Sequence, residues 1–394
     1  MMLIREKVNQ AIQILKEYEI DCWITFVRES SIMHDPMLDF LIQSDVTWHS
    51  AFILTNTGQT YAIVGQMDAQ TIEDLGVYDH VLSYVKGIKE QLCQTIKKLN
   101  PSKIAVNYSR DSEISDGLTH GMYMTLSEFL SEIGYADRII SAEKVTSSLR
   151  ARKTSTELAR IKKAIHQTMA IIEKAASFIA PGRSEKEIAA FMIAEVEKRG
   201  LDFAWEKSHC PAVFTGPETA EAHYRPTERK VERGHILNMD FGVKVKGYCS
   251  DIQRTFYVLR EEENEPPEEV QKGFETIVTA IEKARQSIRP GVQGLAVDKA
   301  ARDYITSQGY KEFPHALGHQ VGRFAHDGTA LLGPAWEKYA QKPFLPLETG
   351  MVFTIEPRLK VPKHGIVTIE EMVVVEEDGA EFLAPPQTKL LLIK

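Results

Sequence analysis

The chain has 394 residues, more than the usual ~100–200 residues of one domain, so its length predicts two domains that each bury a core. Its formal net charge of −8 argues against a large basic surface of the kind that binds phosphate backbones or anionic lipid, so neither nucleic acid nor a membrane is expected as a partner. The four cysteines have no CxxC spacing, which favours a reducing cytoplasm over a disulfide framework or a cysteine zinc site.

The first 20 residues predict an amphipathic helix of a soluble protein. Charges at Arg5, Glu6 and Lys7 interrupt the apolar stretch that a signal peptide needs. No run in the chain approaches the ~18 apolar residues of a membrane-spanning helix.

Residues 1–150 are predicted to form a small α/β domain. The expected strands are 22–26, 51–56, 60–65 and 103–108, and the expected helices after the first are 88–99 and 122–134. A charged connector near residue 150 then leads into a long helix, with Ser155 or Thr156 as its candidate N-cap. The second domain is expected to cover residues 151–394.

This second domain contains an internal repeat, which is a strong guide to architecture. The segment IEKAASFIAPG at 172–182 matches IEKARQSIRPG at 281–291 at a constant offset of 109 residues. In each copy a second helix is predicted to follow and to end at a glycine, Gly200 or Gly309. A pair of helices with a Pro-Gly turn is common, so the segments downstream decide whether the repeat is meaningful.

Each copy continues with the same polar pattern. AHYRP and FAHD each carry an Ala-His pair, and GHILNMD and GMVFTIE each place a glycine six residues before an acid. These acids are Asp240 and Glu356, and a further acid follows in each copy, Asp251 and Glu370. Two copies related by a pseudo-twofold axis would bring their equivalent strands to a common seam with the acids of both facing it. The repeat therefore predicts a functional site.

The first pair of acids lies in a predicted hairpin around Lys246-Gly247. If the strands pair without a bulge, Asp251 lies opposite Gly242 and diagonal to Asp240, on the same face. Two carboxylates so placed can hold metal ions ~3.5–4 Å apart, the spacing of two-metal hydrolytic sites. A lone aspartate is more often a cap or a solvated acid, so this interpretation depends on the other acids.

Glu356 and Glu370 lie in apolar, strand-like runs, FTIEP and VTIEEMVVV. A buried carboxylate needs a proton, a cationic partner or a metal. Glu370 has no lysine or arginine two residues away, and Arg358 pairs with Glu356 only if the strand continues through Pro357. This favours a metal.

His315, His319 and His326 fall within twelve residues and are interleaved with glycines that permit close backbone approach. A single histidine is more often structural, but three so close together favour a site. Four carboxylates with one or two imidazoles form an oxygen-rich ligand set, which points to Mn²⁺ or a similar divalent ion such as Co²⁺, Zn²⁺ or Fe²⁺.

The order and local sequences of five of these residues resemble the pita-bread metallopeptidases, which include Xaa-Pro dipeptidase (prolidase), aminopeptidase P and, more distantly, methionine aminopeptidase. The resemblance implies an α+β fold in which a C-terminal pita-bread domain with an internal pseudo-twofold repeat follows a smaller α/β N-terminal domain. It further implies that Asp240 binds one metal ion, that Asp251 and Glu370 bridge two ions, and that His319 and Glu356 complete the second.

The resemblance also implies the reaction, hydrolysis of the Xaa-Pro bond at the N-terminus of a dipeptide or short peptide by a hydroxide held between the metals. Glu356 would accept and relay the proton. His223 and His326 match histidines that position substrate and stabilise the tetrahedral intermediate, and His315 matches one that lines the same pocket. A homodimer is expected.

Three residues depart from the family pattern. Thr368 stands where many prolidases and aminopeptidases P have an arginine two residues before the last bridging glutamate. Gln320 and Asp327 stand where many prolidases have glycine and glutamate, and the His-Asp pair is closer to aminopeptidase P. The preference between dipeptides and longer peptides therefore stays open.

Three alternatives compete with the peptidase. A creatinase-like hydrolase cleaves a C–N bond without metal, but carboxylates this close would then repel one another. A non-catalytic pita-bread module that binds proteins typically lacks several of the ligands, all of which are retained here. A single-iron oxygenase needs two histidines and one carboxylate, fewer acids than the chain supplies.

Overall fold

The computed structural model describes residues 2–42, 44–110, 112–219 and 225–394 and divides into two compact units, 1–150 and 151–394. Among the described residues, no helix combines the length and the apolar composition that a membrane crossing requires. All four cysteines are free thiols, and Cys22, Cys210 and Cys249 are buried.

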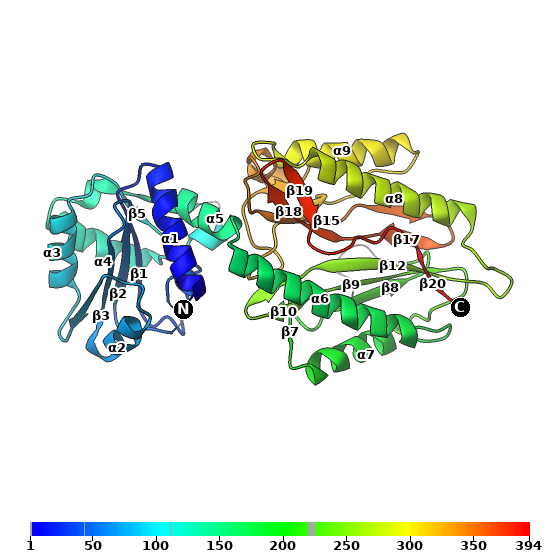
Figure 1. Cartoon of the computed structure of the whole chain (residues 1–394), viewed down its shortest axis with the longest axis horizontal. Helices are drawn as coiled ribbons and strands as arrows, with labels where there is room; N and C mark the ends of the chain where they lie inside the picture. Colours follow the sequence, from blue (N-terminus) through cyan, green and yellow to red (C-terminus); the bar gives the residue numbers. More distant parts are fainter. Residues whose placement is uncertain (1, 43, 111, 220–224) are drawn as a thin grey trace. The chain divides into compact units, whose positions relative to one another are not determined.

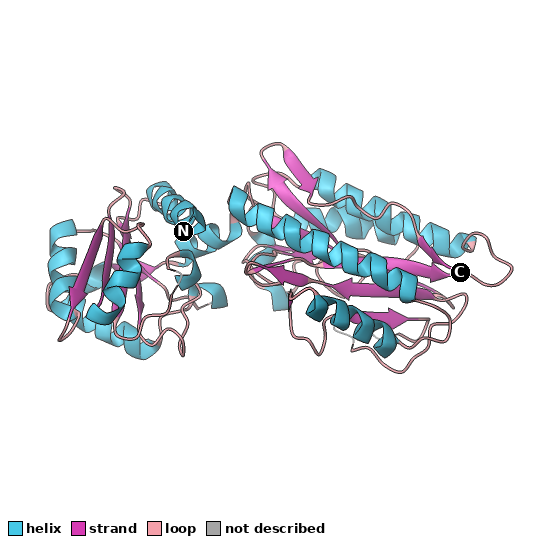
Figure 2. Ribbon diagram, turned by 60° about the horizontal axis from the view of Figure 1, so that its bottom comes forward, coloured by secondary structure: helices cyan, strands magenta, loops and turns pink. Residues whose placement is uncertain are grey.

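The N-terminal unit is a six-stranded mixed sheet with helices on both faces (Figure 2). The strand order is β4-β3-β2-β1-β5-β6. The strands are β1 (Cys22–Val27), β2 (Ser50–Thr55), β3 (Thr60–Gly65), β4 (His80–Tyr84), β5 (Ile104–Val106) and β6 (Ile139–Ser141). The helices are α1 (Met2–Glu17), α2 (Gln66–Asp74), α3 (Lys89–Leu99), α4 (His120–Ser131) and α5 (Glu143–Ala151). The predicted strands and helices of this unit are all present.

Alternation along the strands divides the core of this unit into two layers. Trp23 and Phe52 pack with α1, α2 and α5, whereas their neighbours Ile24 and Ile53 pack with α3 and α4. The central strands are therefore buried on both faces, which explains why they read as continuous apolar runs.

The C-terminal unit contains two helix pairs and a set of short sheets (Figure 1). The helices are α6 (Ser155–Phe178), α7 (Glu185–Lys198), α8 (Glu268–Ser287) and α9 (Gly294–Ser307). The strands of the first half are β7 (Asp202–Phe203), β8 (Ala212–Thr215), β9 (Ile236–Phe241), β10 (Val243–Val245), β11 (Tyr248–Cys249) and β12 (Ile252–Val258). Those of the second half are β13 (Gly318–His319), β14 (Leu331–Leu332), β15 (Val352–Ile355), β16 (Arg358–Val361), β17 (Gly365–Thr368), β18 (Glu371–Glu376), β19 (Gly379–Phe382) and β20 (Leu391–Ile393).

The predicted repeat is present as matching backbone geometry. Gly182 and Gly291 both have φ of 86°, and their N–H groups donate 2.8 Å hydrogen bonds to Val231 and Leu347 respectively. Gly234 and Gly350, which precede the two strands with the first acids, have φ of 86° and 85°. Helix pair and strand therefore follow in the same way in both halves.

The N-cap of α6 differs from the prediction. Thr154, not Ser155 or Thr156, accepts a hydrogen bond from the N–H of Glu157, whose carboxylate accepts one from the N–H of Thr154. Glu157 lies three residues after Thr154, so only Thr154 completes a reciprocal capping box.

Gly242 is the residue that lets the central hairpin close. A Cβ atom at Gly242 would overlap with the carbonyl oxygen of Ser250 and would also crowd the Ala204 side chain. The hairpin therefore requires the absence of a side chain at this position.

We expect Gly242→Ala to lower the free energy of unfolding by about 1–3 kcal/mol, because the added methyl group must displace backbone. Thermal and urea unfolding measure the change. Gly379→Ala is the matched control, since a Cβ there meets only Ile288 at an ordinary 3.9 Å, and we expect a change within about 0.5 kcal/mol. Equal changes in the two variants would contradict the steric explanation.

Candidate metal centre

The hairpin formed by β9 to β12 places Asp240 and Asp251 on one face of the sheet. Asp240 pairs with Gln253, and Phe241 pairs with Ile252. The pairing continues through Lys244 and Cys249 without a change of register. The predicted register is thus confirmed, and Asp251, two residues before Gln253, shares the face of Asp240.

Glu370 joins this face from the second half of the repeat. It pairs with Gln253 in an isolated antiparallel bridge. The Gln253 N–H donates to the Glu370 carbonyl at 3.4 Å, and the Glu370 N–H donates to the Gln253 carbonyl at 3.2 Å. Asp240, Gln253 and Glu370 therefore form a row across three neighbouring segments. This row is the seam between the two copies.

Backbone contacts with β15 bring His319 and Glu356 to the same place. The N–H of His319 donates to Thr354 Oγ1 at 3.1 Å, and the N–H of Glu356 donates to the Leu317 carbonyl at 2.7 Å. Gly318 lies so close to Thr354 that a Cβ atom would overlap with the Thr354 carbonyl.

His319 lies at the centre of three carboxylates. Its Nε2 atom is 3.4 Å from Glu356 Oε1, 3.8 Å from Asp251 Oδ2 and 3.9 Å from Glu370 Oε1. One ligand atom each from Asp251, His319 and Glu370 lies within 4.8 Å of the others. This spacing allows one divalent cation to contact all three groups.

The carboxylates have strongly perturbed pKa values. Burial raises the pKa of Asp240 to about 7 and that of Glu356 to about 8, and the charge of Asp240 adds to the shift at Glu356. Burial and then the neighbouring acids raise the pKa values of Asp251 and Glu370 well above their ordinary values. Asp240, Asp251 and Glu356 each raise the pKa of a neighbouring acid, and divalent cations would stabilise such a donor set in its ionised form.

Glu371 has a different role from its neighbour Glu370. Its side chain projects to the other face of the strand and forms a buried ion pair with Arg254 at 3.0 Å. A buried acid can be stabilised by a cationic side chain or by a metal. Glu371 has the cationic partner, and its neighbour Glu370 is a candidate metal ligand. Glu371 is a structural acid, and Glu370 belongs to the metal-ligand candidates.

The predicted histidines differ in what the structure shows of them. His326 stacks edge-on against His319 with ring centroids 4.1 Å apart, which places it beside the carboxylates. His315 is half-buried, and its Nδ1 lies 2.8 Å from the Ala316 carbonyl. Burial, and then nearby cations that include Arg358, lower the pKa of His315 to about 4, so its imidazole is neutral at pH 7. His223 lies outside the described residues.

Gln320 and Asp327, two of the departures from the family pattern, are buried in the loop that carries His326. The N–H of Asp327 donates to the Gln320 carbonyl at 2.9 Å, and the Gln320 amide donates to the Ala330 carbonyl at 3.2 Å. Asp327 also accepts a hydrogen bond from the N–H of Arg323. Both residues therefore shape the loop beside the acids.

Sequence reasoning missed Gln253. Its side chain is buried, shares the face of Asp240 and Glu370, and donates a hydrogen bond to Asp240 that lowers the pKa of that acid. The only signal in the sequence is that Gln253 lies two residues after Asp251 in an extended segment, which places both side chains on the same face of the strand. Its partners come from residues 240 and 370, so neighbours in sequence do not reveal them.

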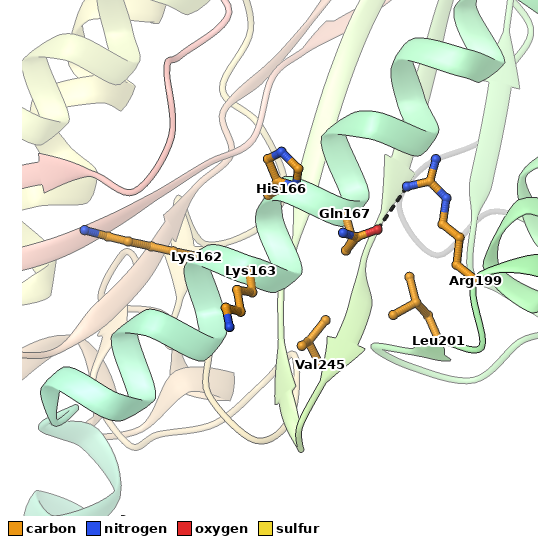
Figure 3. Close-up of a pocket in the computed structure, with 7 residues that line it drawn as sticks. All are labelled: Lys162, Lys163, His166, Gln167, Arg199, Leu201 and Val245. Atoms are coloured by element: carbon orange, nitrogen blue, oxygen red, sulfur yellow. Dashed lines mark hydrogen bonds between the residues drawn. The ribbon is translucent and has the colours of Figure 1, made fainter.

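A pocket of about 570 Å³ lies elsewhere, between α6, Val245 and the residues that follow α7 (Figure 3). Val245 is an odd number of residues from Asp240 and so faces the helix side of the sheet. The lining is basic, with Lys162, Lys163 and Arg199, and contains no carboxylate. This pocket is therefore separate from the row of acids.

Comparison with known families decides what kind of site this is. A model of metallopeptidase family M24 matches residues 159–377, more than half of the chain. The chain belongs to metallopeptidase family M24. It is therefore an enzyme, a hydrolase of the peptidase class, and the matched region contains all five predicted metal ligands.

Several relatives of this M24 peptidase have related sequences. It is 34% identical over 236 residues to an uncharacterised peptidase of Staphylococcus epidermidis, a match that covers 60% of this chain and less than two thirds, 63%, of that protein. It is 29% identical over 322 residues to the Xaa-Pro dipeptidase of Pyrococcus furiosus, covering 79% of this chain and 87% of that one. A putative Xaa-Pro aminopeptidase of Mycoplasma pneumoniae is 30% identical over 270 residues, or 68% and 71% of the two chains.

Solved structures match over the whole length. An Xaa-Pro dipeptidase from Bacillus anthracis aligns with a TM-score of 0.70 and 25% identity, over 99% of this chain and 100% of that one. An X-Pro aminopeptidase from Thermotoga maritima shares the fold, with a TM-score of 0.68, 24% identity and 98% and 99% coverage. The predicted α+β class, with a pita-bread domain after a smaller α/β domain, is confirmed.

We expect the metal-free M24 peptidase to lose stability as the pH rises from about 5 to about 8. A carboxyl group whose pKa is raised on folding stabilises the fold only while it is protonated, and this contribution disappears between the unfolded pKa near 4 and the folded values of about 7 and 8. Thermal unfolding of chelator-treated protein across this range measures the effect. The variant Asp240→Asn should show a shallower pH dependence, and equal slopes for the two proteins would contradict the explanation.

Proposed function

We propose that this M24 peptidase binds two divalent metal ions and hydrolyses the Xaa-Pro bond at the N-terminus of dipeptides or short peptides. The observation that carries the proposal is the convergence of Asp251, His319 and Glu370 within 4.8 Å, with Asp240 and Glu356 electrostatically coupled to them. The names of the relatives from Pyrococcus furiosus and Bacillus anthracis support the Xaa-Pro specificity.

In the proposed site, Asp240, Asp251, His319, Glu356 and Glu370 would hold the two metal ions, and the family resemblance implies that Asp251 and Glu370 would be shared by both. When bound, the metal ions supply an activated water and polarise the scissile carbonyl. The mainly oxygen ligand set favours Mn²⁺. The homodimer and the cytoplasmic location stay predictions.

The protein side chains around the metals have separate tasks. Glu356, whose Oε1 lies 3.4 Å from His319 Nε2, would accept a proton from the attacking water and pass it to the leaving amine. His326, which stacks on His319, donates a hydrogen bond where oxyanion charge develops. His315 lines the substrate pocket as a neutral imidazole, and His223 is assigned a substrate-positioning role from the family resemblance alone.

The alternatives fit this arrangement less well. A metal-free creatinase-like hydrolase would have to keep four acids together without cations, although Asp240, Asp251 and Glu356 each raise the pKa of a neighbouring acid. A binding module has no need for such a cluster, because buried like charges lower stability. The acids therefore favour the metallopeptidase over both.

We expect reconstituted protein to bind about two Mn²⁺ ions per chain and to hydrolyse Ala-Pro in a metal-dependent reaction. Metal analysis gives the stoichiometry, and release of free proline measures the activity, with Ala-Pro-Ala tested in parallel. The same protein treated with a chelator is the control and should be inactive. Less than one metal ion after reconstitution, with no hydrolysis of either peptide, would overturn the proposal.

We expect Glu370→Gln to lower kcat/KM for Ala-Pro by at least about 100-fold and to reduce the bound metal, because a neutral amide cannot bridge two cations. Glu376→Gln is the matched control, since Glu376 is an exposed acid of the same strand segment, and it should leave both quantities unchanged. If Glu370→Gln retained full metal content and activity, the bridging assignment would be wrong.

A further inference from the structure

Asp298 and Arg302 form a buried ion pair on α9. They are four residues apart, so their side chains lie side by side on one face of the helix, and they are 1% and 7% exposed. Arg302 Nε donates to Asp298 Oδ2 at 2.7 Å, and Nη2 donates to Oδ1 at 2.8 Å. Burial raises the pKa of Asp298, and Arg302 opposes that rise. The two parallel hydrogen bonds fix the orientation of both groups, and with it the directions of their remaining donors and acceptors.

The remaining atoms of the pair bind the segment that connects α9 to β13. Arg302 donates one hydrogen bond to the Phe313 carbonyl and another to the His315 carbonyl, each at 2.7 Å. The N–H of Leu317 donates to Asp298 Oδ1 at 3.1 Å. The guanidinium also lies 3.9 Å from the centroid of the Phe313 ring. Every second residue of the segment, from 313 to 317, is therefore bound to the ion pair.

Leu317 connects the ion pair to the candidate metal ligands. Its N–H is bound to Asp298, and its carbonyl accepts the 2.7 Å hydrogen bond from the N–H of Glu356. His319 follows two residues later, and its Nε2 lies 3.4 Å from Glu356 Oε1. A shift of this segment would therefore displace both His319 and Glu356.

The first half of the repeat shows that a helix pair of this kind does not need the ion pair. In α7, the residues 109 positions earlier are Ala189 and Ile193. A buried ion pair is often no more stabilising than apolar side chains of similar volume, so the stability of the helix pair does not explain its presence in α9. The pair occurs in the half that carries His315, His319 and His326. Its bonds to the segment before His319 offer the explanation.

We propose that Arg302, oriented by Asp298, is a positioning residue that holds segment 313–317 and thereby places His319 and Glu356 for metal binding. The inference rests on the metal-dependent activity proposed above and adds to it a residue that acts through the backbone of others. Groups that orient metal ligands commonly change metal affinity or activity by ~10- to 100-fold when they are lost. Arginine suits this task because its planar group has five donors in fixed directions, whereas lysine has three donors on one nitrogen.

The experiment compares wild type with Arg302→Lys, which keeps the charge beside Asp298 but loses the fixed donors to the two carbonyls. We expect the Mn²⁺ dissociation constant, measured by calorimetric titration, to rise about 10- to 100-fold, and kcat for Ala-Pro at saturating Mn²⁺ to fall by a similar factor. Both are measured well below the unfolding temperature of the variant, so that loss of folded protein does not contribute. An unchanged dissociation constant would overturn the inference, whatever the change in kcat.

Two controls separate positioning from general destabilisation. Arg285 of α8 also pairs with an acid, Glu282, and donates to a backbone carbonyl, that of Ala380 at 2.8 Å. Arg285→Lys should leave Mn²⁺ binding and kcat unchanged even if thermal unfolding shifts. Glu312→Gln removes an exposed partner of Arg302, 3.1 Å away, and should also leave both quantities unchanged. If Arg285→Lys weakened Mn²⁺ binding as much as Arg302→Lys, the inference would be wrong.

Hydrogen exchange distinguishes a failure of this inference from a failure of the proposed function. If wild type cleaves neither Ala-Pro nor Ala-Pro-Ala, the Xaa-Pro activity is wrong, and the Mn²⁺ dissociation constants still test Arg302. If wild type binds no Mn²⁺, or Arg302→Lys does not fold, amide exchange in metal-free wild type decides. Slow exchange across 313–317, compared with the exposed Lys311 and Glu312, supports the inference, whereas exchange as fast as theirs overturns it.

Discussion

The rest of the C-terminal unit depends on the burial of four carboxylates at the seam between its two halves. Burial raises the pKa of each, and neighbouring acids add to the shift at Asp251, Glu356 and Glu370. Such a cluster opposes folding unless protons or cations neutralise it. The backbone that carries these side chains is nevertheless extended and hydrogen-bonded. The unfavourable contribution to folding therefore comes from the carboxylates themselves, which are the groups that can bind metal.

The internal repeat explains how one chain gathers so many acids. Each half has a helix pair, a glycine with positive φ and a strand with an acid at or next to its end. The N–H groups of Gly234 and Gly350 make equivalent hydrogen bonds of 2.7 and 2.8 Å to the carbonyls of Val258 and Val375. Neither half alone supplies all the candidate ligands. The backbone bridge between Gln253 and Glu370 joins the halves, so the site exists only where the two copies meet.

Local patterns could be predicted well, because short-range geometry determines them. The hairpin register followed from a two-residue turn at Lys246-Gly247, where φ values of 49° and 81° give the twist that antiparallel strands favour. The N-cap at Thr154 was missed although Glu157 supplied the signal three residues later. In that stretch Thr154, Ser155 and Thr156 are all good caps, and only the reciprocal bond distinguishes them.

Long-range placements were harder to predict for a physical reason. Gln253 is an ordinary polar residue in its own strand, and its importance comes from Asp240 on one side and Glu370 on the other. The division of labour between Glu370 and Glu371 likewise depends on Arg254, more than a hundred residues away. Sequence showed that these acids needed partners, but it did not show which partner each would find.

Arg358 and Thr368 extend this point to the comparison of relatives. Side chains that face each other on paired strands have Cβ atoms only ~4.5–5.5 Å apart, so a long side chain on either strand can serve the same space. The family resemblance implies an arginine two residues before Glu370, at the position of Thr368, and here the facing strand carries Arg358 directly opposite. A comparison of sequences position by position would record Thr368 as the loss of a positive charge. The strand pairing shows that a positive charge is still present on that face. The pair of facing positions, and not the single position, is therefore the unit whose chemistry should be compared.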